Sequence, residues 1–95
     1  MKVVWTKRAI RHLETLRNFI AIDSEQNAAV VAGRIVAGVE LLETHPEAGW
    51  PGRLVGTREL VAPRTSYLIP YRIRGGRLDL LAILHGRQKW PSKFP

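Results

Sequence analysis

Three side chains in the second half of the sequence are the leading candidates for binding or chemistry: Arg72, His85 and Arg87. Guanidinium groups can hold phosphate or carboxylate groups, and an imidazole can exchange a proton near neutral pH. We expect Arg72 and His85 to share one face of a β-sheet, with Arg87 just beyond its edge. Together they would present two cations and one titratable ring to a polyanion or to an acidic protein surface.

The positive charge of the chain is concentrated in the same half. The formal net charge is +7, and residues 1–49 carry equal numbers of basic and acidic side chains. Residues 50–95 carry nine Lys and Arg against two acidic side chains, so the whole excess lies there. This asymmetry suggests a nucleic acid or an acidic protein segment as the partner. A basic surface without any partner is the plainer alternative.

Several kinds of functional site are excluded by composition. The chain has no cysteine, which excludes disulfides, thiol catalysis and cysteine-ligated zinc. Its three histidines have no metal-ligand spacing, and it has no Ser-His-Asp set, phosphate-binding loop or dinucleotide fingerprint. We therefore expect neither a metal nor a cofactor.

No apolar run approaches the ~20 residues that span a bilayer, and the first six residues lack the signal-peptide pattern. We predict a cytoplasmic protein without a membrane partner.

The elements that must position these side chains follow from periodicity and turn chemistry. A β-prone segment at residues 2–6 precedes two amphipathic helices, predicted over residues 7–22 and 25–44 with Thr6 and Ser24 as N-caps. Gly33 and Gly38 weaken the second helix but permit close backbone approach. Residues 45–52 are predicted as a loop, and strands are predicted at 57–62, 66–74 and 77–85. The sequence therefore predicts one α+β domain over residues 1–95, of order β-α-α-β-β-β, with an N-terminal helical hairpin packed on one face of a mainly antiparallel twisted sheet.

The Gly75-Gly76 turn sets the register of the last two strands. A two-residue turn places Arg72 opposite Asp79, and side chains then alternate between the two faces. The face expected under the helices carries Tyr67, Ile69, Tyr71, Ile73, Leu78, Leu80, Ala82 and Leu84. The other face is expected to be a partner site, basic at the turn and apolar midway; it carries Leu68, Pro70, Arg72, Arg74, Arg77, Asp79, Leu81, Ile83 and His85. Pro70 cannot donate a ladder hydrogen bond and needs a sheet edge or a bulge.

Segments along nearly the whole chain resemble the RelE/ParE superfamily of toxins from type II toxin–antitoxin systems. The resemblance rests on residues 56–61 (GTRELV), 67–73 (YLIPYRI) and 80–87 (LLAILHGR), together with the Trp5-Thr6 entry and the HPEAG loop at 45–49. It implies a growth-arresting toxin of a plasmid-stabilisation module. It also implies a cognate acidic or amphipathic antitoxin that forms a hetero-oligomer with the toxin.

The resemblance leaves two modes of action open. ParE-like members poison DNA gyrase, whereas RelE-like members cleave mRNA on the ribosome, which would make the protein a ribosome-dependent endoribonuclease. RelE-like nucleases tend to carry Arg where this chain has Leu68, and often a Tyr or His near the C-terminus, where residues 90–95 contain neither. These departures favour the ParE-like, non-enzymatic branch.

If the chain cleaves RNA, it needs a base, a cation for the phosphate and a proton donor. The candidate catalytic residues are then His85, Arg72 and Glu59, with Arg58 as an alternative cation. The strand at 57–62 can have either register, so the residue pattern does not show which of Arg58 and Glu59 faces the site. The candidate target-binding residues are Arg58, Arg72, Arg74, Arg87, Lys89 and Trp90.

Structural roles are the alternatives at several of these positions. Arg72 could form a cross-strand ion pair with Asp79, and His85 could cap the sheet with a hydrogen bond. Trp50 and Trp90 are predicted to cover the core rather than to stack on bases, and His12 is predicted to lie on the wet side of its helix. A different functional class, a non-toxic nucleic-acid-binding module, also accounts for the excess arginine.

Overall fold

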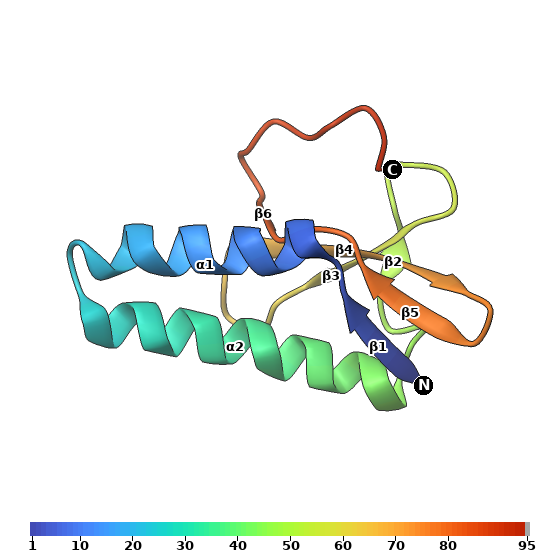
Figure 1. Cartoon of the computed structure of the whole chain (residues 1–95), viewed down its shortest axis with the longest axis horizontal. Coiled ribbons are helices and arrows are strands. Elements are labelled where there is room, and N and C mark those ends of the chain that lie inside the picture. Colours follow the sequence, from blue (N-terminus) through green and yellow to red (C-terminus); the bar gives the residue numbers. More distant parts are fainter. Residues whose placement is uncertain (95) are drawn as a thin grey trace.

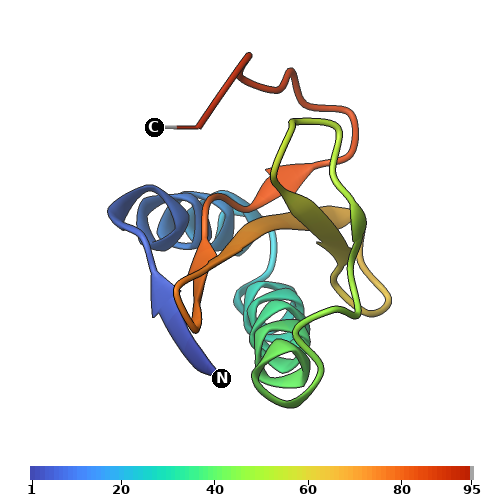
Figure 2. The same cartoon turned by 90° about the vertical axis from the view of Figure 1, so that its right-hand side faces the viewer.

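The computed structural model describes residues 1–94 and confirms the predicted α+β architecture, with two helices packed on one face of a sheet (Figures 1 and 2). Pro95, the end of the predicted domain, lies outside the described residues. The elements in chain order are β1 (Lys2–Trp5), α1 (Lys7–Ala21), α2 (Glu25–Thr44), β2 (Trp50–Pro51), β3 (Arg58–Val61), β4 (Tyr67–Arg74), β5 (Arg77–Leu80) and β6 (Leu84–His85).

The sheet is mixed, with the strand order β1-β5-β4-β3-β2 and β6 paired to β4 off this path. The β1–β5 pair is parallel, whereas the other described pairs are antiparallel. Strand β2 falls within the segment predicted as a loop, where it adds a two-residue edge to β3. The core between helices and sheet is formed by buried side chains from α1, α2, β4 and β5, including Ala9, Leu16, Ile35, Val39, Leu42, Ile69, Tyr71, Leu78 and Leu80.

Both predicted N-caps are confirmed. The Ser24 side chain accepts a hydrogen bond from the Asn27 amide (3.0 Å), and Thr6 Oγ1 accepts one from the Ala9 amide (3.2 Å). The Thr6 hydroxyl also donates to the Leu80 carbonyl at 2.6 Å. Thr6 therefore starts α1 and ties that start to the end of β5.

Removing this cap should weaken the fold measurably. We expect Thr6→Val, which keeps the shape and loses the hydroxyl, to lower the free energy of unfolding by about 1–2 kcal/mol, the usual cost of losing an N-cap. Thr6→Ser keeps the hydroxyl and should stay close to wild type. Urea unfolding of both variants measures the difference. Equal stability of the two variants would contradict the assigned cap.

Gly38 allows α2 to approach the sheet closely, as predicted. A Cβ atom built there would lie 3.3 Å from Ile69 Cδ1 and 3.5 Å from Leu60 Cδ2. At Gly33 nothing lies within 4 Å of such an atom, so the predicted close approach applies to Gly38 alone of the two helical glycines.

The predicted hairpin register is confirmed from the Gly75-Gly76 turn as far as Leu80, which pairs with Tyr71. Both turn glycines have positive φ (59° and 72°), which explains why glycine occupies these positions. At the next position the Leu81 amide donates to the Pro70 carbonyl at 2.9 Å. Pro70 has no N–H to return a bond, so the ladder stops there.

The chain resumes pairing one residue out of the predicted register. Leu68 pairs with Leu84 and Tyr67 pairs with His85, whereas the uninterrupted hairpin would pair Leu68 with Ile83. One extra residue on this side is a β-bulge, which reverses the faces of the side chains after it. Pro70 is fully buried beside this bulge, one of the two placements predicted for it.

The predicted face assignments are therefore wrong for Ile83, Leu84 and His85. His85 lies on the face of Tyr67, which the helices cover, and Leu84 lies with Leu68 on the other face. Ile83 turns toward α1 and is buried. Ile73 keeps its predicted face but is 36% exposed near the end of the hairpin, so it is not covered by the helices as expected.

Candidate functional site

The sheet face turned away from the helices, called here the outer face, is basic at its hairpin end, as predicted. Register places Arg72, Arg74 and Arg77 on this face of β4 and β5. Lys2 of β1 pairs with Arg77 and adds a fourth cation. Asp79, opposite Arg72 as predicted, is the carboxylate in this group, and it forms an ion pair with Arg77 (Nε–Oδ1 2.9 Å) on its own strand.

Glu59 also lies on the outer face, which answers the question that the sequence left open. It pairs with Pro70, whereas Arg58 pairs with Tyr71 and shares the helix-covered face. The Glu59 carboxylate accepts hydrogen bonds from the Arg53 backbone amide (2.7 Å) and from Arg53 Nε (3.3 Å). Glu59 therefore anchors the loop before β3 and is not oriented as a free base.

Arg58 has a comparable anchoring contact on the opposite face. Its guanidinium donates to the carbonyl oxygens of Gly49 (2.7 Å) and Glu47 (3.4 Å). The arginine thus secures the loop between α2 and β2. This contact places it away from the arginines of the outer face.

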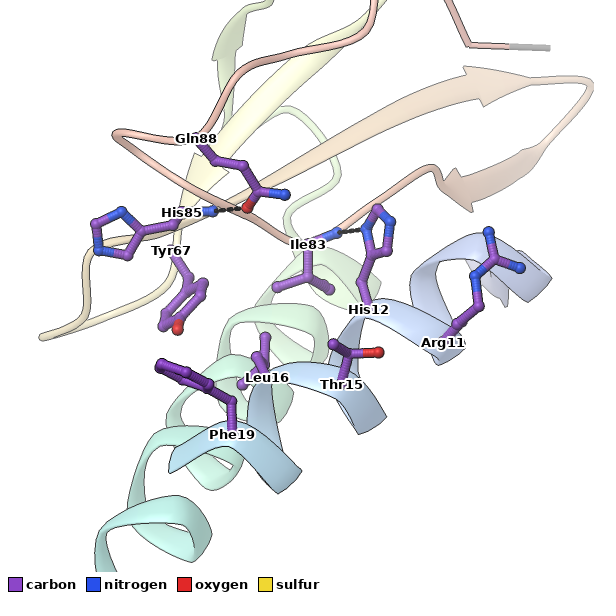
Figure 3. Close-up of a pocket in the computed structure, with 9 residues that line it drawn as sticks. All are labelled: Arg11, His12, Thr15, Leu16, Phe19, Tyr67, Ile83, His85 and Gln88. Atoms are coloured by element: carbon purple, nitrogen blue, oxygen red, sulfur yellow. Dashed lines mark hydrogen bonds between the residues drawn. The ribbon is translucent and has the colours of Figure 1, made fainter. Parts of the chain in front are cut away.

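His85 belongs to a groove between α1 and the segment that follows β5, called here the histidine groove. The groove has a volume of about 410 Å³ and is lined by Arg11, His12, Thr15, Leu16, Phe19, Tyr67, Ile83, His85 and Gln88 (Figure 3). The rings of His85 and Tyr67 meet edge to face with centroids 5.3 Å apart. Arg72 and His85 consequently lie on opposite faces, and the predicted common face is wrong because of the bulge.

The hydrogen bonds of His85 match the structural alternative considered for it. Its Nδ1 atom accepts from the Arg87 amide (3.1 Å), and its own amide donates to Gln88 Oε1 (3.0 Å). These bonds close the turn that leaves β6. The imidazole therefore stabilises local backbone in the arrangement that the structure shows.

His12 also lines this groove, although the sequence predicted it on the wet side of α1. Its ring is half-buried, and Nδ1 accepts a hydrogen bond from the Ile83 amide at 3.2 Å (Figure 3). Burial, followed by the charges of Arg8 and Arg11, lowers the pKa of His12 below its usual 6.5. Helical periodicity could not reveal this role, because the covering segment is about seventy residues away in sequence.

Acidification should destabilise the protein through His12. In the unfolded chain this histidine titrates near about 6.5, above its pKa in the folded protein. Between these two values the unfolded chain binds more protons, so the free energy of unfolding should fall as the pH drops below about 6.5. His12→Asn, whose Oδ1 can accept the Ile83 amide, should reduce this dependence in urea unfolding at a series of pH values. Identical pH profiles for the two proteins would exclude His12 as the cause.

The basic segment after β6 folds back on the molecule. Arg87 and Lys89 are exposed, whereas Trp90 is partly buried and packs its ring on the Arg53 guanidinium, 3.7 Å from the ring centroid. Figure 2 shows this segment on the side of the sheet away from α2. Trp90 thus packs on the loop before β3 beside the outer face, and its predicted role as a cover for the core stays a prediction. Trp50 is 77% exposed, so its predicted role as a cover for the core is wrong.

The structure joins some predicted site residues and separates others. Arg72 and Arg74 share the outer face with Glu59, while His85 and Arg58 lie on the helix-covered face. Arg53, which ties Glu59 to Trp90, was not predicted, since no local pattern links a loop arginine to the C-terminal segment.

Within residues 1–94, no group of three His, Asp or Glu side chains could hold a metal ion. No described helix is long and apolar enough to cross a membrane.

Comparison with known proteins gives concordant matches. Residues 3–90 match the family model described as the ParE toxin of the type II toxin–antitoxin system parDE. A protein of Sinorhizobium fredii (strain NBRC 101917 / NGR234), named "Putative toxin Y4kP", is 40% identical over 91 residues, which cover 96% of this chain and 94% of the relative. A solved structure described as "Chromosomal ParDE TA system from P. aeruginosa" superimposes with a TM-score of 0.80 at 25% identity. The superposition covers 90% of this chain and 95% of the chain in that structure.

Proposed function

Because the chain belongs to the ParE toxin family of type II toxin–antitoxin systems, we propose that it arrests bacterial growth by inhibiting DNA gyrase. The observation that carries this proposal is the separation of the candidate catalytic groups. RNA cleavage needs a base, a cation and a proton donor within hydrogen-bond reach of one reacting phosphate. His85 lies on one face of the sheet, while Arg72 and Glu59 lie on the other.

The remaining candidate base supports the same choice. Glu59 is held by three hydrogen bonds from Arg53, and the Trp90 ring packs on the Arg53 guanidinium. Freeing the carboxylate would require the loop and the C-terminal segment to move together. A binding mechanism needs no such movement, because the exposed cations of the outer face and of the C-terminal segment are already accessible.

A pair of assays tests this function. Purified toxin should inhibit negative supercoiling by gyrase, or trap cleaved DNA, and should leave mRNA intact on translating ribosomes. Codon-dependent cuts in the ribosomal A site, seen by toe-printing without any effect on gyrase, would establish the mRNA-interferase alternative instead. Normal growth of bacteria that express the folded protein at high level would contradict a toxic function of either kind.

We further propose that a cognate antitoxin neutralises the toxin in the cytoplasm. The solved relative is described as a ParDE system, and the net charge of +7 favours an acidic partner. An acidic or amphipathic antitoxin segment would fold onto the toxin as it binds. Co-expression of a candidate antitoxin of this chemistry should restore growth, and the two proteins should purify together. A toxin that purifies without the co-expressed protein would contradict this pairing.

A further inference from the structure

Three cations stand side by side across three adjacent strands of the outer face. Lys2 of β1 pairs with Arg77 of β5, which pairs with Arg74 of β4. Neighbouring strands are about 4.8 Å apart, and like charges directly opposite one another destabilise a sheet. The fold therefore maintains this arrangement, called here the cationic row, against a cost to its own stability. Such a local conflict is typical of functional positions.

The carboxylates of the outer face neutralise only one of the three cations of this row, Arg77. Asp79 is only 8% exposed and is engaged by Arg77, and Glu59 is engaged by Arg53. Within residues 1–94, Lys2 and Arg74 form no ion pair, and both side chains are exposed. At least two full positive charges are thus available to an external anion.

The surroundings of the row suit a phosphate backbone better than a protein. Gly75 and Gly76 flank it with bare backbone, and a Cβ atom built at either meets nothing within 4 Å. A bulky polymer can therefore lie directly against the hairpin. Ile73, the exposed apolar side chain of this hairpin, points to the opposite face. The row consequently lacks the apolar centre of a protein interface, whereas guanidinium forks match phosphate geometry.

We propose that the cationic row binds the phosphate backbone of duplex DNA, so that the toxin contacts DNA as well as gyrase when it acts. The DNA contact stands on the row alone, while its use during inhibition rests on the proposed gyrase function. Binding of DNA phosphates by the cationic row should not depend on the base sequence, and its affinity should fall strongly as the salt concentration rises. It would hold the toxin on the DNA that its target enzyme also engages.

The test compares two doubly substituted proteins of equal net charge. Lys2→Gln/Arg74→Gln removes two cations from the row, and Lys7→Gln/Arg17→Gln removes two exposed cations from α1. Binding of a short fluorescent DNA duplex is followed by anisotropy over a range of salt concentrations. The row variant should lose about tenfold or more in affinity at low salt, and its log–log salt slope should decrease by about 1.8, since each phosphate contact contributes about 0.9. The α1 variant should remain close to wild type.

Thermal unfolding shows whether the loss of DNA affinity comes from lost contacts or from an unfolded protein. The row variant should melt at or above the wild-type temperature, because it removes repulsion between adjacent strands. Equal DNA affinity of the row and α1 variants would overturn the proposal. So would tighter row-dependent binding of poly-L-glutamate than of the duplex, since that result would assign the row to an acidic protein.

The same proteins separate this inference from the proposed function. A toxin that binds the duplex through the row yet leaves supercoiling unaffected would refute gyrase inhibition and retain the DNA contact. A toxin that inhibits gyrase without row-dependent DNA binding would retain the function and overturn the contact.

Discussion

Replacement of Gly49 by alanine is expected to lower the free energy of unfolding by about 3–5 kcal/mol, a large part of the total for a small domain. Gly49 is buried where the loop after α2 meets the sheet. A Cβ atom there would lie 2.7 Å from both Cε1 and Oη of Tyr71 and 2.8 Å from the Glu59 carbonyl oxygen. The last contact is with backbone, so the clash cannot be relieved by a side-chain rotation alone.

The displacement would also break a buried hydrogen-bond chain. The Gly49 amide donates to Tyr71 Oη at 2.9 Å, and the Tyr71 hydroxyl donates to the Pro46 carbonyl at 2.7 Å. Burial raises the pKa of the Tyr71 phenol above its usual 10, so the hydroxyl keeps its proton at neutral pH. Each buried group left without a partner costs about 1–3 kcal/mol.

Gly33→Ala provides a matched control with the opposite sign. Gly33 lies in α2 with open space around it, so alanine should stabilise the helix by up to about 1 kcal/mol. Tyr71→Phe removes the hydroxyl and should cost about 1–3 kcal/mol on its own. Because both changes break the same bond, Gly49→Ala/Tyr71→Phe should lose less stability than the sum of the two. Additive losses in urea unfolding, or a Gly49→Ala protein as stable as wild type, would contradict this account.

Local sequence signals predicted most of the fold. The helices follow from their apolar period and from the caps Thr6 and Ser24, because these signals act within a few residues. The Gly75-Gly76 turn fixed the hairpin register near it for the same reason. The outer position of the basic hairpin end followed directly from that register.

The register beyond Leu80 could not be obtained by counting from the turn. The bulge arises because Pro70, on the partner strand, cannot return the hydrogen bond that it accepts from Leu81. The sequence showed that Pro70 needed a bulge or an edge, but not where the extra residue would be placed. That one residue moved His85 to the other face and separated it from Arg72.

Contacts across long sequence separations account for the other differences. His12 is covered by Ile83, and Arg53 lies between Glu59 and Trp90. Neither contact has a periodic pattern: the first depends on the path of the chain between β5 and β6, and the second on its path after β6. Trp50 shows the converse, since a large apolar residue next to a proline looked like a core cover but lies on the exposed edge strand β2.

Two regions of the chain are basic and exposed, namely the hairpin end of the outer face and the segment after β6. Replacing one cation in each of them by glutamate is expected to abolish the toxin's action. Arg74 lies at the hairpin end of the outer face, and Arg87 lies in the segment after β6; both side chains are exposed. The positive charge of both segments predicts an anionic surface on the target, and placing like charges against such a surface costs several kcal/mol. Arg74→Glu/Arg87→Glu should therefore raise the concentration needed for half-inhibition of gyrase by at least about a hundredfold, since 1.4 kcal/mol corresponds to tenfold. Expression of this variant should no longer arrest growth.

Two further proteins make this result specific. Lys7→Glu/Arg17→Glu carries the same net charge but alters α1, and it should remain inhibitory. His85→Asn keeps an acceptor oxygen where His85 Nδ1 accepts the Arg87 amide, so a structural His85 tolerates the change. A catalytic His85 would instead lose about 10²–10⁴-fold in rate. Retained toxicity of the Arg74→Glu/Arg87→Glu protein, once its melting curve shows that it is folded, would exclude these two basic segments as the target-binding site. Loss of toxicity in His85→Asn would instead indicate that the imidazole is needed for the toxin's action. The histidine groove would then be the candidate nuclease site.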